Sequence, residues 1–104
     1  MRLDIITLFP EVFSPLFSSI PARAQQKGAL DIHLHWLREF GLGPHRQVDD
    51  SPFGGGPGMV LKCEPIFECL DTVPQTPGRV VVYPTPQGTP FKQHHALELS
   101  ECPH

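Results

Sequence analysis

The stretch Leu3-Asp4-Ile5-Ile6-Thr7-Leu8-Phe9, closed by Pro10, is a short run of apolar, β-branched and aromatic residues. Such a run is typical of a strand buried on both faces, as in the interior of a parallel sheet. Apolar residues then recur at helical spacing over Pro10–Ile20, where Pro15 predicts a split or a kink. A strand that leads directly into a helix favours an α/β fold.

The next segments repeat this order of helix and strand. Pro21–Lys27 is a second short helical piece that ends at Gly28, and it is followed by an alternating strand over Leu30–Leu37. A crossover of this length predicts that the second strand is parallel to the first. His33 and His35 share one face of that strand, which we interpret as a solvated face rather than a metal site, because no third ligand follows at a recognisable spacing.

The second half of the chain predicts one further strand and two helices. Ile66–Leu70 is a short helix with Pro65 at its start, Arg79–Tyr83 is an inner parallel strand, and Phe91–Leu99 is a helix. We therefore expect three parallel strands in an incomplete doubly wound sheet, in which a further strand would close the pattern.

The composition excludes several classes of protein. The chain has 104 residues and a net charge of -3, which argues against a surface that is basic throughout and binds nucleic acid everywhere. The three cysteines lack the CxxC spacing of metal and redox sites and favour reduced thiols. The first apolar run is too short for a signal peptide or a membrane span. We expect a cytoplasmic protein with no membrane association.

One loop combines an open backbone with charged side chains. Phe53-Gly54-Gly55-Gly56-Pro57-Gly58-Met59 follows the carboxylates Asp49 and Asp50 and the basic residues His45 and Arg46. Glycines leave backbone N–H groups unshielded and permit positive φ angles, so the loop is either a tight turn or a wall that closely approaches a polar ligand. The sequence also leaves open whether Asp49 and Asp50 act as a base, but a pair that stabilises the turn or orients a substrate is favoured.

A second class of function is a nucleotide- or anion-binding module without catalysis, with residues 54–58 as an anion nest. No Gly-Lys-Ser/Thr follows these glycines, and they do not lie between a first strand and its helix. Both absences disfavour the common nucleotide-binding motifs.

Three segments together resemble the N-terminal part of the bacterial tRNA (guanine-N1)-methyltransferase family. They are Ile5-Ile6-Thr7-Leu8-Phe9-Pro10-Glu11-Val12-Phe13, the block from His45 to Met59, and Tyr83-Pro84-Thr85-Pro86-Gln87-Gly88. The resemblance covers nearly the whole chain, and its middle block is highly specific. It implies methylation of guanine N1 in tRNA, next to the anticodon on its 3′ side, with S-adenosylmethionine as the methyl donor.

The resemblance also implies an architecture and a cofactor site. The fold would be a parallel-sheet α/β domain of the trefoil-knot methyltransferase type, in a homodimer, with the cofactor held in the knot. Tyr83, Pro84, Thr85, Pro86, Gln87 and Gly88 would form the first cofactor-binding loop. Pro84 and Thr85 stand where Leu-Ser is more common in the family, and Pro84 has no N–H to donate.

The substrate site follows from the same resemblance. Asp50 would contact the tRNA near the target base, while Gly56, Pro57 and Gly58 would shape the pocket, and we expect this loop and Tyr83–Gly88 to form two walls of one cavity. No catalytic residue is assigned, because the family's aspartate base, its arginine, the later knot loops and the C-terminal tRNA-gripping domain would follow residue 104. We therefore expect residues 1–104 to be a partial N-terminal methyltransferase domain, truncated before the knot is completed and inactive alone.

Overall fold

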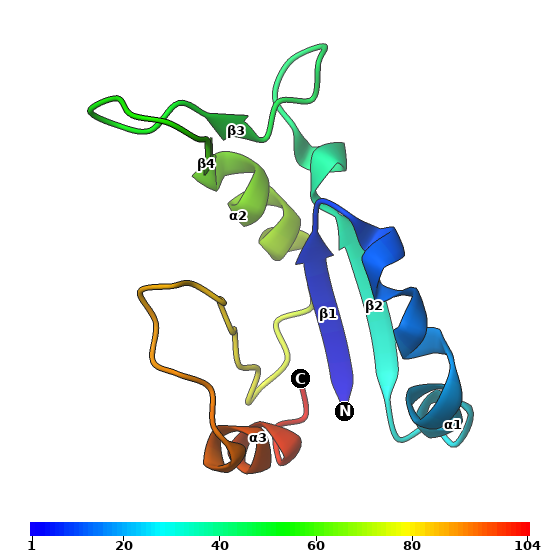
Figure 1. Ribbon diagram of the computed structural model, residues 1–104. Coiled ribbons are helices and arrows are strands. Elements are labelled where there is room, and N and C mark those ends of the chain that lie inside the picture. Colours follow the sequence, from blue (N-terminus) through cyan, green and yellow to red (C-terminus); the bar gives the residue numbers. More distant parts are fainter.

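The computed structural model describes residues 1–104, and a pair of parallel strands lies at its centre. Strand β1 (Arg2–Thr7) pairs with strand β2 (Asp31–Trp36) in a register that runs from Arg2↔Asp31 to Thr7↔Trp36. The strands lie side by side in Figure 1, and helical segments connect them. The prediction of two parallel strands joined by a helical crossover is confirmed.

The crossover consists of two helices that differ in type. Segment η1 (Pro10–Phe17) is a 3-10 helix that contains Pro15, and α1 (Ser19–Gln26) is an α-helix. Extended backbone at Ser18, with φ -134° and ψ 167°, separates the two, so of the predicted split or kink the structure shows a split, three residues after Pro15. Helix α1 begins two residues before Pro21, and Gly28 follows it with φ 71°, in the conformation that ends many helices.

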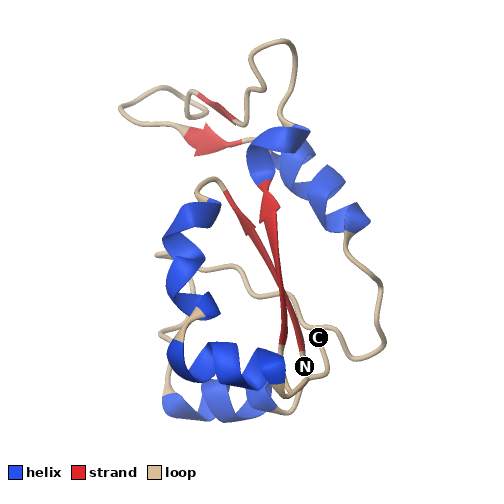
Figure 2. Ribbon diagram, turned by 90° about the vertical axis from the view of Figure 1, so that its right-hand side faces the viewer, coloured by secondary structure: helices blue, strands red, loops and turns tan.

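The strand pair has helices on both sides. In Figure 2, η1 lies on one side of the strands and α2 (Cys63–Thr72) on the other. A short 3-10 helix, η2 (Leu37–Phe40), follows β2 directly and contacts α2. Helix α2 is longer at both ends than the predicted segment Ile66–Leu70 and includes Pro65 in its first turn, where the missing N–H costs no helical hydrogen bond.

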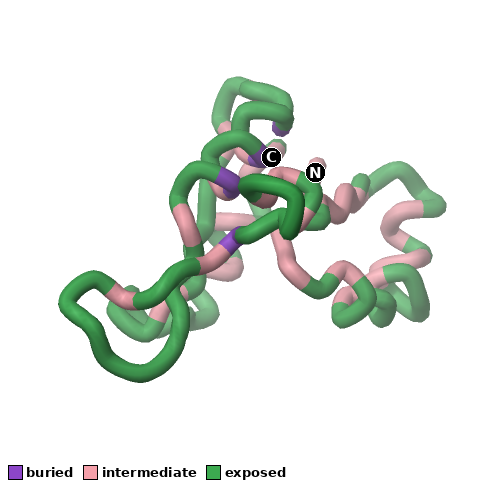
Figure 3. The backbone as a smooth tube through the Cα atoms, turned by 90° about the horizontal axis from the view of Figure 1, so that it is seen from above, coloured by how far each residue is buried: buried purple, intermediate pink, exposed green.

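The core is small and lies where β1, η2 and α2 meet. Leu37, Val48 and Cys69 are 3%, 0% and 0% exposed, and Ile6 and Leu8 pack against them. Most of the chain traced in Figure 3 is exposed or half-buried. Few side chains therefore hold the helices against the strands, and each of them contributes a large share of the stability.

Residues 41–62 contain paired structure that the sequence pattern did not predict. Leu42 and Gln47 form an isolated antiparallel bridge, and strands β3 (Asp49–Asp50) and β4 (Val60–Leu61) pair antiparallel. Lys62 N–H donates to Val48 O at 2.8 Å and continues this pairing. The glycine-rich stretch is thus the connection of a short hairpin, at the upper left of Figure 1.

The predicted third parallel strand is wrong. Residues 79–83 form no strand, and the only backbone bond from Val80–Tyr83 outside helices and strands joins Val80 N–H to His104 O at 2.9 Å. Val80, Val81, Val82 and Tyr83 are 47 to 72% exposed. A strand requires a neighbouring strand for its hydrogen bonds, and none lies beside this segment. Helix α3 (Gln93–Ser100) lies within the predicted Phe91–Leu99 segment apart from its last residue.

None of these helices has both the length and the apolar character needed to cross a bilayer. The two ends of the chain lie close together at the start of β1 (Figure 1), where Arg2 N–H donates to Pro103 O at 2.8 Å.

Candidate functional site

The β3–β4 loop exposes a backbone that only glycine adopts easily. Gly54, Gly55, Gly56 and Gly58 have φ angles of 83°, 80°, 113° and 94°, and nothing lies within 4 Å of where their Cβ atoms would be. Only Gly55 among them uses its N–H within the loop, with Pro52 O at 3.1 Å. The N–H groups of the other three remain available to a ligand.

Asp50 stands at the base of this loop and is held as a carboxylate. The N–H of Ser51 donates to Oδ1 at 2.8 Å, and the Lys62 ammonium lies 3.4 Å from Oδ2. These two contacts lower the pKa of Asp50 below its usual range. A carboxylate with a lowered pKa is a weak proton acceptor, so Asp50 is suited to orient a polar group rather than to act as a base.

The segment Tyr83–Gly88 forms an exposed turn between α2 and α3. Gly88 N–H donates to Thr85 O at 3.0 Å, which closes the turn, and a Cβ at Gly88 would lie 3.3 Å from that oxygen. Tyr83 is 72% exposed. Pro84 and Pro86 have no N–H, so Tyr83 and Thr85 supply the free backbone donors of the turn.

A shallow hollow of about 320 Å³ lies beside this turn. Its walls are Val82 and Thr89, which flank the segment on either side, together with Phe91, His95, Glu98 and Leu99. None of the six predicted cofactor residues lines the hollow, although both of their immediate neighbours do.

The structure does not bring the two predicted walls together. The β3–β4 loop lies at the upper left of Figure 1, and the segment 83–88 lies below it beyond α2. No hydrogen bond joins them, and neither described hollow is lined by residues of both. The expected shared cavity is therefore not seen in this structure.

A second hollow, of about 460 Å³, was not predicted from the sequence. Leu8, Phe9, Pro10 and Glu11 line it from the end of β1, and Trp36 and Arg38 line it from the end of β2. Ligands commonly bind at the carboxyl ends of parallel strands, and this rule could have identified the hollow from the sequence.

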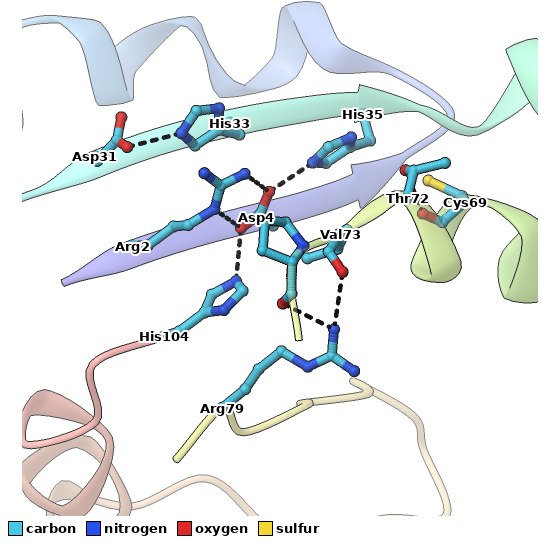
Figure 4. A network of polar contacts seen from close by, with 11 residues as sticks. Arg2, Asp4, Asp31, His33, His35, Cys69, Thr72, Val73, Arg79 and His104 are labelled. Carbon is cyan, nitrogen blue, oxygen red and sulfur yellow. Dashed lines mark hydrogen bonds and ion pairs between the residues drawn. The ribbon is translucent and has the colours of Figure 1, made fainter. Parts of the chain in front are cut away.

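A polar cluster at the opposite end of β1 holds Asp4, and Figure 4 shows its contacts. Asp4 accepts hydrogen bonds from Arg2 at 2.7 and 2.9 Å and lies 2.7 Å from ring nitrogens of both His35 and His104. Burial acts to raise the pKa of Asp4, but these contacts outweigh it and hold the pKa well below its usual range. His33 pairs separately with Asp31 at 2.8 Å.

Comparison with known proteins gives the arrangement a context. A family model described as tRNA (Guanine-1)-methyltransferase TrmD matches residues 1–104. The curated tRNA (guanine-N(1)-)-methyltransferase of Streptomyces avermitilis is 45% identical over 109 aligned residues, which cover 99% of this chain and 39% of the relative. The protein of the same name from Thermosynechococcus vestitus is 50% identical, over 96% of this chain and 43% of the relative.

The fold has a solved counterpart. The crystal structure of tRNA (m1G37) methyltransferase from Aquifex aeolicus superposes with a TM-score of 0.62 at 44% sequence identity. The superposition covers 68% of this chain and 32% of that chain. The chain thus spans about two fifths of the length of the curated relatives it matches, at 39% and 43% of the two named above.

Proposed function

Because the chain belongs to the tRNA (guanine-1)-methyltransferase family, we propose that it serves the transfer of a methyl group from S-adenosylmethionine to guanine N1 of tRNA, next to the anticodon. The observation that carries this proposal is the family match over residues 1–104, with 45 to 50% identity to curated relatives. The corresponding part of an intact enzyme is its N-terminal methyltransferase domain. In this proposal the knot and a C-terminal tRNA-gripping domain belong to the remaining length of the relatives.

The cofactor is assigned to Tyr83, Pro84, Thr85, Pro86, Gln87 and Gly88. The exposed Tyr83 and the free N–H groups of Tyr83 and Thr85 support this assignment, since an adenosyl group offers a ring to stack and acceptors to bind. S-Adenosylmethionine supplies the electrophilic methyl group. The turn provides one wall of a site, and a second wall is needed to enclose the cofactor.

The target guanine is assigned to Asp50, Gly56, Pro57 and Gly58. Three free N–H groups in the loop and the carboxylate of Asp50 can bind acceptors and donors on a base edge. Guanine N1 carries a proton at neutral pH, and this proton must leave as the N–C bond forms. The lowered pKa of Asp50 supports an orienting role, so the base is assigned to no residue among 1–104.

The partners follow from the same family membership. We assign tRNA as the substrate, a homodimer as the assembly and the cytoplasm as the location. Large apolar side chains on the crossover support the dimer, since Val12, Phe17 and Ile20 are 68%, 48% and 75% exposed. The three free cysteines agree with a reducing compartment.

Calorimetric titration tests the cofactor assignment. S-Adenosylmethionine should give a weak, saturable heat of binding, and a plain nucleotide such as GTP should give less. Gln87→Ala should weaken the binding of S-adenosylmethionine, while Gln75→Ala should not, since both glutamines are exposed and Gln75 lies outside the turn. Preference for GTP would instead favour a nucleotide- or anion-binding module built on the glycine loop.

A further inference from the structure

The hollow at the carboxyl ends of β1 and β2 belongs to neither of the sites proposed above. Its volume is about 460 Å³, and its lining comes from the four residues after β1, Leu8 to Glu11, and from Trp36 and Arg38. The glycine loop and the segment 83–88 contribute nothing to it. It therefore requires an explanation of its own.

The parallel register builds this hollow directly. Thr7 is paired with Trp36 at the last position of the ladder, so both strands end at the same level and their following residues face one edge. Phe9 N–H donates to Thr7 Oγ1 at 3.1 Å, and Val12 N–H donates to Phe9 O at 3.1 Å. These bonds fix the turn that presents Phe9 and Glu11.

The lining offers an aromatic surface beside two charges of opposite sign. Trp36 is 39% exposed and Phe9 is 57% exposed, so part of each ring is open to a ligand. Arg38 and Glu11 line the same hollow, and neither side chain forms a hydrogen bond or an ion pair with another residue. Both charged groups are therefore free to bind a ligand.

We propose that this hollow binds one unpaired nucleotide of an RNA strand. The base stacks on Trp36, its phosphate pairs with Arg38, and Glu11 accepts a hydrogen bond from an N–H of the base. The choice of RNA over a free nucleotide rests on the tRNA substrate proposed above. The assigned contacts use the chemistry by which proteins bind single-stranded RNA, namely aromatic stacking with a basic group on the backbone.

The overall charge makes stacking the main source of affinity. With a net charge of -3, the chain cannot attract RNA over its whole surface, and only Arg38 in the hollow meets a phosphate. A single phosphate contact on a single strand predicts a slope of about -0.7 for log K against log salt. A much steeper slope would mean that binding occurs on a different and more basic surface, and would overturn the proposal.

Trp36 is the only tryptophan of the chain, so its fluorescence reports on the hollow directly. Titration of the full chain with a short adenylate oligoribonucleotide should quench this fluorescence saturably. Adenosine monophosphate should quench it more weakly, and an abasic ribose-phosphate oligomer should not quench it. Absence of saturable quenching, equal affinity for adenosine monophosphate, or equal binding of the abasic oligomer would overturn the proposal.

Variants locate the binding. Arg38→Gln should weaken oligonucleotide binding about tenfold, because one charge-assisted contact is lost. The fold should be unaffected, because the Arg38 side chain has no hydrogen-bond partner in the protein. Arg23→Gln makes the same charge change on exposed α1 and should bind like the wild type. Equal effects of the two substitutions, in variants with wild-type circular dichroism, would contradict the assigned hollow.

Fluorescence anisotropy of a dye-labelled oligonucleotide measures how much the Trp36 ring contributes to RNA binding. Trp36→Leu should weaken binding about tenfold, as expected for the loss of one stacked base. Gln75→Ala should leave RNA binding unchanged, because Gln75 is exposed and lies outside the hollow. If S-adenosylmethionine does not bind but RNA still quenches the fluorescence of Trp36, only the cofactor assignment is wrong. If S-adenosylmethionine binds but RNA does not quench this fluorescence, only the RNA site proposed here is wrong.

Discussion

The Nε2 atom of His104 lies 2.7 Å from Oδ2 of Asp4, although the two residues are 100 positions apart in the chain. Both side chains are almost completely buried, with 4% and 5% exposed. Arg2 and His35 complete the set of donors around the carboxylate (Figure 4). This cluster connects the first strand to the segment that follows α3, where the small apolar core does not reach.

Asp4→Asn should change how stability depends on pH. The pKa of folded Asp4 lies below its ordinary value of 3.8, so the ionised group stabilises the fold above that pH. Its contribution is lost as the pH falls below 3.8 toward the lower pKa of the folded state. Urea unfolding at a series of pH values should therefore give a shallower acid decline in Asp4→Asn, together with lower stability at neutral pH.

Asp31→Asn is the matched control for this substitution. Asp31 pairs with His33 on the surface, where its side chain is 68% exposed, and surface pairs contribute little. Its acid decline should match that of the wild type. An Asp4→Asn variant with an unaltered acid decline would show that the buried cluster does not set the pH dependence.

The thiols should differ sharply in reactivity. Cys69 is 0% exposed in the core, and burial, the largest cause, raises the pKa of its thiol, so little thiolate is available. Cys63 is exposed at the start of α2. A thiol reagent followed by peptide mass mapping should label Cys63 rapidly and Cys69 only after urea is added. Rapid labelling of Cys69 in the native protein would mean that α2 does not pack as described.

Gly41 should tolerate no side chain. A Cβ atom at this position would clash with the backbone carbonyl of Arg46, across the Leu42–Gln47 bridge. Gly41→Ala must displace the backbone at Arg46. Val48, two residues further along the chain, is part of the core, so this displacement should also disturb the core. Gly43→Ala is the control: it meets no atom within 4 Å and costs only the strain of a φ of 69°, about 1 to 2 kcal/mol. Urea unfolding should therefore show a larger loss for Gly41→Ala, and equal losses would contradict the tight approach.

The part of the fold that follows local rules was predictable. Leu3–Phe9 and Leu30–Leu37 carry their own strand patterns, and the helical crossover between them predicts a parallel pair. Arg79–Tyr83 has an equally apolar pattern but forms no strand. A pattern records that a segment requires burial, while pairing also requires a partner strand, and none lies beside these residues.

Of the candidate sites, the glycine loop could be predicted from the sequence and the hollow beside Trp36 was not. Positive φ angles at Gly54, Gly55, Gly56 and Gly58 follow from glycine chemistry, and the open loop was expected. The hollow beside Trp36 was missed because apolar residues in a strand are ordinarily interpreted as core. The register, which ends both strands at Thr7 and Trp36, places Trp36 and the residues after Thr7 at one open edge of the strand pair.

A chimeric enzyme tests the central claim most directly. Residues 1–104 replace the matched part of the Streptomyces avermitilis relative, and methyl transfer from S-adenosylmethionine to guanine N1 of a tRNA transcript is measured. The chimera should methylate the tRNA, and Gln87→Ala within it should lose most of that activity while Gln75→Ala retains it. A folded chimera that transfers no methyl group, or one in which the two glutamine variants are equally active, would contradict the assigned function.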